Sequence, residues 1–168
     1  MADIEWNADQ FMIAAENAVY DALETVGVHL ADKLGDTLNR QSSNKSNGGS
    51  PSAPGEPPAK DTGTLARSIS YMVNDNGTLD VGVAKQSPAN KYALVMEYGS
   101  RGPIKPKKAK ALHWKDKNGK DVFARQVVIQ ARPWLRPTVA IEWKNLPEIF
   151  SKSMKRSLPN WLWEGDPI

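Results

Sequence analysis

The chain has 168 residues, a net charge of +3, a hydrophobic fraction of 40% and no cysteine. This size and composition are typical of one globular domain, and the lack of cysteine excludes disulfides and cysteine-based metal or redox sites. No apolar run reaches the roughly 18 residues of a transmembrane helix. The acidic first residues do not resemble a signal peptide. We therefore expect a single domain over residues 1–168, with no membrane contact, that is made and kept in a cytoplasm.

The charge is distributed unevenly along the chain. Residues 1–40 hold eight acidic and two basic side chains (−6), whereas residues 101–125 hold nine basic and two acidic ones (+7). An acidic and a basic segment in one chain suit head-to-tail contact between identical subunits. Charged runs are more often simply solvated surface. Both interpretations stay open on the sequence alone.

The first predicted element is a long amphipathic helix over residues 8–40. Its apolar residues recur at spacings of three and four, which is the signature of one helix face. They are Phe11, Ala15, Ala18, Val19, Ala22, Val26, Leu30, Leu34 and Leu38. Gly27 and Gly35 weaken this helix slightly. Residues 41–61 are rich in Ser, Asn, Gly and Pro, which predicts a flexible loop that orders against a neighbour in an assembly.

Two hairpins and a short helix are predicted next. A helical turn over 62–68 leads into a strand whose apolar residues alternate, and Asn76-Gly77 predicts a two-residue turn to a return strand over 78–84. Residues 92–98 fit a short helix or a buried strand. We favour the helix, ended by Gly99. Residues 103–126 predict a basic hairpin insertion around Asn118-Gly119.

Residues 131–137 lead into a predicted final helix, with Pro137 in its first turn and a kink or restart at Pro147. The Trp-rich tail over residues 159–168 follows it. This order predicts an α+β fold, an antiparallel sheet of two hairpins with the long N-terminal helix and the C-terminal helix packed on it, and with long mobile loops.

Catalytic motifs are absent from the sequence. It contains no Gly-x-Ser-x-Gly elbow, phosphate loop or dinucleotide fingerprint, and His29 and His113 are not spaced as metal ligands. Glu97 is the one acid inside an apolar segment. A general base is one interpretation, but a glutamate that fixes a turn or pairs with an arginine is favoured. We expect no enzymatic activity, no cofactor and no metal.

Basic and aromatic residues give the candidate contacts. Arg101, Lys105, Lys107, Lys108 and Lys110 lie close to Trp114, a combination that suits nucleic-acid phosphates or an acidic partner. Trp161 and Trp163 in the tail either fold back on the domain or dock on a partner.

Three stretches together resemble the tail-completion, or head–tail joining, family of long-tailed bacteriophages. The first follows a Pro-Gly-x-Pro-Pro loop and matches Thr-Gly-x-Leu-x-x-Ser-Ile. The second matches Tyr-Ala-x-x-x-Glu-[Phe/Tyr]-Gly-[Thr/Ser], and the third Arg-Pro-Phe-[Leu/Met]-x-Pro-Ala-[Leu/Val]. The residues that carry these motifs here are Thr62, Gly63, Leu65, Ser68, Ile69, Tyr92, Glu97, Tyr98, Gly99, Pro133, Trp134, Leu135 and Pro137. Trp134 and Thr138 depart from the pattern, and the insertion over 103–126 is longer than in many members.

The resemblance implies a structural virion protein that forms a ring, by the family a hexamer, at the head–tail junction. The expected partners are other copies of the chain, the neck or connector proteins, and the tail tube or terminator, with non-specific contact to passing DNA. Assembly would take place in the host cytoplasm. Two alternatives stay open: a tail-terminator or minor capsid component, and a small basic nucleic-acid-binding protein.

Overall fold

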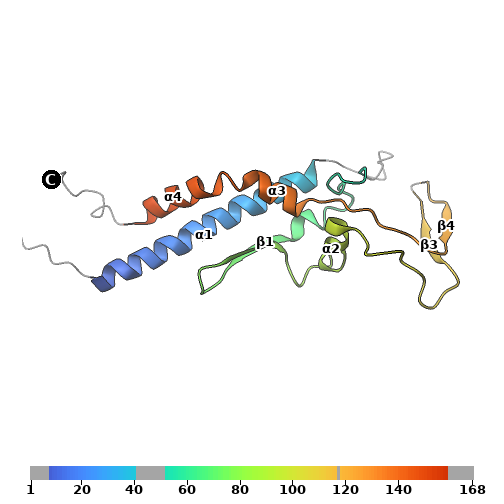
Figure 1. Cartoon of the computed structure of the whole chain (residues 1–168), viewed down its shortest axis with the longest axis horizontal. Coiled ribbons are helices and arrows are strands. Elements are labelled where there is room, and N and C mark those ends of the chain that lie inside the picture. The colour runs from blue at the N-terminus through green and yellow to red at the C-terminus, as the bar shows by residue number, and fades with distance from the viewer. Residues whose placement is uncertain (1–7, 41–51, 117, 159–168) are drawn as a thin grey trace, which may run out of the picture.

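The computed structural model describes residues 8–40, 52–116 and 118–158, which form an elongated body with a projecting arm (Figure 1). In chain order the elements are α1 (Ala8–Asn39), the 3-10 helix η2 (Ala66–Ser68), β1 (Ile69–Val73), β2 (Leu79–Val83), α2 (Asn90–Tyr98), β3 (Leu112–Lys115), β4 (Asp121–Ala124), α3 (Leu135–Glu142) and α4 (Leu146–Ser157). The predicted α+β class is confirmed, and so is the favoured helix at residues 92–98.

Helix α1 is the axis of the body. Its 32 residues correspond to a length of about 48 Å. The predicted apolar face is largely confirmed, since Ala18, Ala22, Val26, Leu30, Leu34 and Leu38 are buried. Helix α4 packs along one side of α1 and the β1–β2 hairpin along another (Figure 1). The contact with α4 is close, because the hydroxyls of Thr25 and Ser153 lie 2.8 Å apart.

Gly27 has a packing role that the sequence does not reveal. A glycine inside a helix costs stability relative to alanine. Here a Cβ at position 27 would clash with the ring of Tyr71 on β1. The glycine therefore lets the Tyr71 ring lie directly against the backbone of α1. A Cβ at Gly35 would meet nothing within 4 Å.

The two hairpins form two separate sheets, which corrects the single sheet that we predicted. In one sheet β1 pairs with β2, and in the other β3 pairs with β4. The first hairpin packs on α1, whereas the second lies at the far end of the molecule (Figure 1). The C-terminal helices pack on α1 instead of on a sheet. The segment 101–111 is rich in lysine and proline, so it offers little apolar surface for folding back on the body.

The hairpin turns are longer than the predicted two residues. In the first, Gly77 N donates to Asn74 O (3.0 Å) and Asn74 N donates to Thr78 O (2.8 Å). The second repeats this pattern, since Gly119 N donates to Asp116 O at 3.0 Å. Both glycines have positive φ, 75° and 78°. Each Asn-Gly pair therefore supplies the left-handed last position of a four-residue turn.

The segment between α1 and η2 is described from residue 52 onward, and residues 41–51 of the predicted flexible loop lie outside the described residues. Ser52 and Pro58 are buried. Gly55 N donates to Ala131 O at 2.9 Å, and the Arg132 guanidinium donates to Ser52 O through Nη2 at 3.2 Å. This half of the loop is therefore held on the body by specific contacts, whereas its composition predicts a flexible loop.

The predicted restart at Pro147 is confirmed, because α3 ends at Glu142 and α4 begins at Leu146. Proline is tolerated in a first helical turn, where its missing N–H would have no partner within the helix. Among the described helices, none combines the length and apolarity that a membrane crossing requires. The Trp-rich tail over 159–168 lies outside the described residues.

Candidate functional site

The three sequence motifs meet in one buried cluster, which we call the motif core. It consists of Leu34, Leu38, Leu65, Ala89, Ala93 and Trp134, with Ile69 and Leu135 packed at its edge. Leu65 comes from the first motif, Ala93 from the second and Trp134 from the third. Segments that lie far apart in the sequence are thus joined against the C-terminal half of α1 by shared apolar burial.

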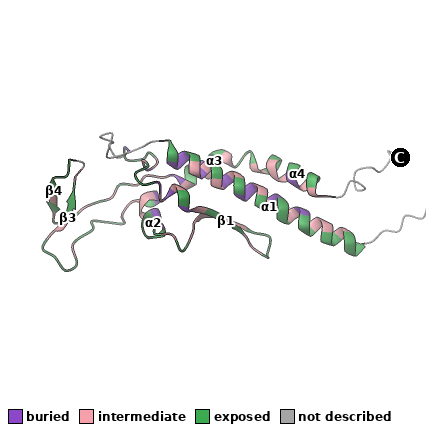
Figure 2. Cartoon of the chain, turned by 180° about the vertical axis from the view of Figure 1, so that it is seen from behind, coloured by how far each residue is buried: buried purple, intermediate pink, exposed green. Residues whose placement is uncertain are grey.

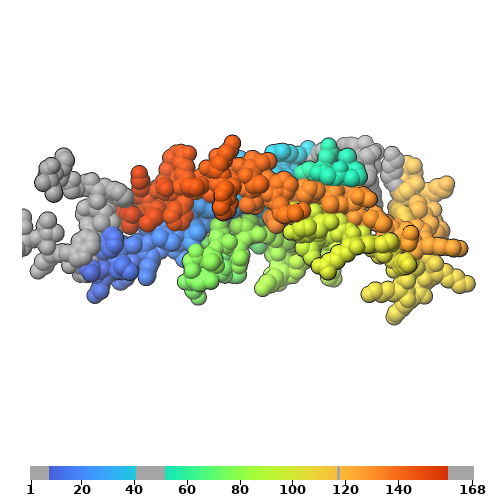
Figure 3. Space-filling model, in the orientation of Figure 1, coloured from blue at the N-terminus to red at the C-terminus, as the bar shows by residue number. Residues whose placement is uncertain are grey.

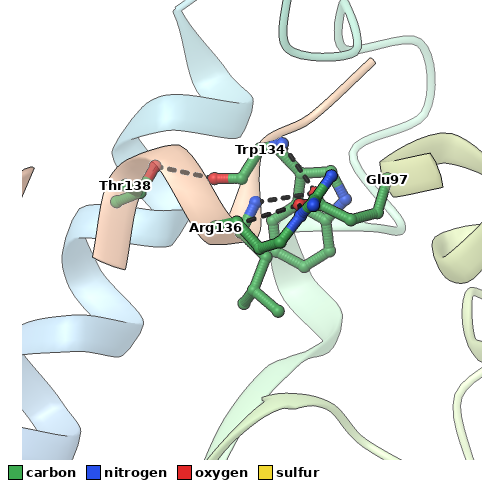
Figure 4. A network of polar contacts seen from close by, with 5 residues as sticks. Glu97, Trp134, Arg136 and Thr138 are labelled. Atoms are coloured by element: carbon green, nitrogen blue, oxygen red, sulfur yellow. Dashed lines mark hydrogen bonds and ion pairs between the residues drawn. The ribbon is translucent and has the colours of Figure 1, made fainter. Parts of the chain in front are cut away.

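Glu97 of α2 holds the start of α3. Its Oε2 accepts hydrogen bonds from the backbone N–H groups of Trp134 (2.7 Å) and Leu135 (2.9 Å). Its Oε1 accepts from the backbone N–H and from Nε of Arg136, both at 3.1 Å (Figure 4). The first N–H groups of a helix have no partner within the helix, and the helix dipole favours a negative charge there. Glu97 is therefore a cap supplied from another helix.

The environment of Glu97 keeps it ionised. Burial of this side chain, which is 3% exposed, raises its pKa, but the N–H groups of Trp134, Leu135 and Arg136 and the Arg136 side chain outweigh burial. The net effect lowers the pKa of Glu97 below 4.5. A general base works best with a pKa near the operating pH, so this carboxylate is poorly suited to that role. The favoured interpretation, a glutamate that fixes a turn and pairs with an arginine, is confirmed.

Arg136 joins a third group to this contact. Its guanidinium carbon lies 4.3 Å from the centre of the Tyr98 ring, a cation–π arrangement. Tyr98 itself is exposed, as are Tyr92 and Pro137, while Pro133 is half-buried. The motif residues thus divide into a buried set that packs and an exposed set around it.

Gly99 ends α2 and starts the arm, which we define as residues 100–130. Its φ is 75°, and a Cβ there would lie 2.8 Å from the carbonyl oxygen of Ile129. Only glycine fits both conditions. Ser100 N donates to Ile129 O (2.9 Å), and Ser100 Oγ accepts from Ile129 N (3.1 Å). Ser100 therefore joins the two legs of the arm at their root.

The first motif forms the turn between the 52–61 segment and β1. The Thr62 hydroxyl stays within this turn, since it lies 2.8 Å from the Thr64 hydroxyl and accepts a long hydrogen bond of 3.4 Å from Thr64 N. Ser68 makes the stronger connection. Its buried hydroxyl contacts the Thr64 carbonyl and the Ser87 hydroxyl, which lies just before α2. This serine therefore links the first motif to the start of the second.

The two departures from the family pattern lie side by side. The Thr138 hydroxyl donates to Trp134 O at 2.7 Å and lies 3.0 Å from the Thr37 hydroxyl of α1. Thr138 therefore adds a buried hydrogen bond between α3 and α1. Trp134 is 2% exposed, and within the described part of the chain its Nε1 has no hydrogen-bond partner. A phenylalanine here would leave no such N–H unpaired.

Two arginines flanking Trp134 were missed as site residues by the sequence reasoning. Arg136 pairs with Glu97, and Arg132 holds Ser52 through Nε, 3.1 Å from Ser52 Oγ. The third motif could have pointed to both residues, because it begins with one arginine and carries the other between Leu135 and a proline.

The arm is a separate lobe (Figure 3). Its legs are joined by a bridge between Ile104 and Val127 and by the pairing of β3 with β4. None of the described residues from 99 to 131 is buried (Figure 2). The predicted basic contacts Arg101, Lys105, Lys107, Lys108 and Lys110 are all exposed on its first leg, and Trp114 is 41% exposed on β3. Trp161 and Trp163 lie outside the described residues.

The histidines are far apart, and each lies beside a carboxylate. His29 Nε2 is 2.8 Å from Glu142 Oε2, and this contact is the main cause that lowers the pKa of Glu142. His113 Nε2 is 2.7 Å from Asp121 Oδ1. Within residues 8–40, 52–116 and 118–158, no group of three or more His, Asp or Glu side chains could hold a metal ion.

A groove of about 780 Å³ lies where the arm leaves α2. Its walls include Leu94, Tyr98 and Ile104, and its lining contains no His, Asp or Glu. The groove thus offers apolar contact surface without an acid–base pair.

Comparison with known proteins identifies no relative: no family model, no curated protein and no solved structure matches this chain. Function is therefore inferred from the motifs and from the surfaces that they position.

Proposed function

We propose that this protein is a non-enzymatic structural component of a tailed phage particle. In this proposal, copies of the chain form a ring, by the family resemblance a hexamer, at the head–tail junction. The ring completes the tail and joins it to the head connector. The observation that carries the proposal is the meeting of all three family-like motifs in the motif core. Their residues pack, cap and pair, as Glu97 does with α3, and they position the arm.

The form and charge of the subunit also support assembly. The N-terminal half of α1 and the basic arm lie at opposite ends of an elongated molecule (Figure 1). A subunit with two different complementary surfaces associates head to tail, and such contacts close into a ring when the rotation between subunits permits. The groove at the root of the arm adds apolar surface that a neighbouring subunit could contact.

Light scattering over a range of protein concentrations, with and without purified phage tails, tests the proposal. We expect a ring that forms with rising concentration, or a monomer that becomes a ring on tails. Negative-stain images should then show a closed particle with a central opening. A chain that stays monomeric and ignores tails would refute this function.

A place elsewhere in the particle, as a tail terminator or minor capsid component, is the nearest alternative. Labelling the chain with an antibody in purified particles separates these locations. A label at the neck supports the head–tail junction, whereas a label on the shell would move the protein to the capsid.

Nucleic-acid binding is a second candidate function, favoured by the five exposed basic residues of the first leg beside Trp114. Lysines near an exposed aromatic ring attract phosphates and stack on bases without reading sequence. This function predicts salt-sensitive DNA binding that is lost when Lys105, Lys107, Lys108 and Lys110 are all changed to alanine. Binding unaffected by these changes would eliminate it.

A further inference from the structure

The β3–β4 hairpin has one apolar face that stays partly exposed, since Trp114 is 41% exposed and Leu112, Val122 and Ala124 are half-buried. Residues directly opposite each other on antiparallel strands share a face. Leu112 pairs with Ala124 and Trp114 with Val122, so these four side chains lie together. An isolated two-stranded hairpin is only marginally stable in water. A contact that covers this apolar face would therefore stabilise the hairpin.

The opposite face of the hairpin carries His113 and Phe123, which contact each other although Phe123 stays 67% exposed. The ring of His113 stacks on Phe123 with 4.6 Å between centroids, and His113 also bonds Asp121. In the sequence, lysines lie before the hairpin and in its turn, and residues 101–125 as a whole carry a charge of +7. The tip of the arm thus combines an apolar face with basic flanking segments, which we call its basic rim.

A surface of the opposite kind lies on the N-terminal half of α1. Asp9, Met12, Ile13, Glu16 and Tyr20 recur at spacings that place them on one side of the helix. Met12, Ile13 and Tyr20 are 56%, 59% and 45% exposed, and both acids are exposed as well. Between residues 8 and 28 the sequence has four acids and neither lysine nor arginine. We call this surface the acidic stripe.

We propose that the apolar face of the arm tip docks on the acidic stripe of a second copy of the chain. This inference rests on the proposed function and names the contact that would link neighbouring subunits. The two surfaces match in chemistry, since each has an apolar centre and the rims are opposite in charge. They also match in size: four-residue strands span about 13 Å, and the stripe from Asp9 to Tyr20 spans about 17 Å.

The positions of the two surfaces make the contact intermolecular. The arm and the first turns of α1 lie at opposite ends of the subunit (Figures 1 and 3). Each subunit therefore gives its arm to one neighbour and receives the arm of another. Association should weaken with salt, because the rims are exposed and their attraction is screened.

Cross-linking between single-cysteine chains tests this contact directly, because the natural chain contains no cysteine. One chain carries Asn17→Cys at the edge of the stripe, and the other carries Lys110→Cys on the arm. We expect a short bismaleimide to join them into dimers in the mixture and in neither chain alone. The matched control replaces Asn17→Cys by Lys144→Cys, an exposed position between α3 and α4. Equal yield with the control, or no cross-link, overturns the proposal.

Charge reversal supplies a second, independent measurement. Lys107→Glu with Lys108→Glu, or Asp9→Lys with Glu16→Lys, should each lower association about tenfold. Both sets in one chain should restore it, since the rims are again opposite. Rings that form undiminished in each variant would overturn this interface while leaving the proposed function intact. Absence of rings in the unaltered chain, even with tails, would remove both. The lysine charge reversals can also be placed in the cross-linking chains. If they abolish DNA binding but leave the cross-link unchanged, the lysines contact DNA, and this result counts against the basic rim as part of the interface.

Discussion

Replacing Glu97 by glutamine tests the capping contact with almost no change of shape. The amide nitrogen donates, so one of the two oxygen positions no longer accepts. The less costly orientation keeps the bonds to Trp134 and Leu135 and turns the NH2 group towards Arg136. It loses one buried backbone hydrogen bond to a charged group, about 1.5–3 kcal/mol, and weakens two others. The Arg136 side chain is 59% exposed, so its ion pair adds little.

We therefore expect Glu97→Gln to lower the free energy of unfolding by about 3 kcal/mol. Urea unfolding followed by tryptophan fluorescence and circular dichroism measures this loss. Glu148→Gln is the matched control, because Glu148 also pairs with a cation, Lys152 at 2.7 Å, but on the surface. Its midpoint should not move measurably. An equal midpoint for both variants would refute the assignment of Glu97 as the cap of α3.

The pH dependence gives the same variant a second readout. The pKa of Glu97 in the folded protein lies below its ordinary value of 4.5. Such a carboxylate stabilises the fold fully above the unfolded pKa, and this contribution is lost as the pH falls through the folded pKa. The difference in the free energy of unfolding between the natural chain and Glu97→Gln should stay constant above pH 4.5 and narrow at lower pH. A difference that widens on acidification would show that the carboxylate is not stabilised by its ionised form.

Three further predictions concern packing, each measured by urea unfolding unless stated. Gly27→Ala should destabilise by about 1–3 kcal/mol, because its Cβ clashes with β1, whereas Gly35→Ala should stabilise by about 0.5–1 kcal/mol; the reverse order would contradict the packing. Trp134→Phe should change stability by less than about 1 kcal/mol, since removal of an unpaired N–H offsets lost area, but Trp134→Ala should cost about 3–5 kcal/mol. Arg132→Lys should loosen the segment at Ser52 and speed its cleavage in limited proteolysis. Unchanged cleavage would show that Arg132 does not hold this segment on the body.

The parts of the fold that were predictable are those governed by local pattern. The spacing of apolar residues places α1 within one residue of its observed end, because burial of one helix face imposes that period. The alternation around Tyr71 and Val81 similarly identifies β1 and β2. The interruption at Pro147 follows from its missing N–H. Each of these inferences uses only neighbours in the sequence.

The contacts that could not be predicted join distant segments. Periodicity shows that a residue is buried but does not name its partner, so the Tyr71 ring against Gly27 was not foreseen. The separation of the two hairpins depends on whether β3 and β4 find an apolar surface on the body, which their own alternation does not decide. For Glu97 the residue type and the apolar setting predicted pairing with an arginine, while the three backbone donors depend on where α3 begins.

The root of the arm makes that appendage an interchangeable module. Ser100 and Ile129 are joined by two hydrogen bonds, so the chain leaves and re-enters the body through a gap one strand pair wide. An inserted segment of any length can join these two positions if its own ends lie close together, and the entropy cost of closing such a loop grows only slowly with length. Replacing the residues between these two positions by a short turn should therefore leave the body folded. The same body could receive arms of other sizes and chemistries, and its choice of neighbour would change without redesign of the fold.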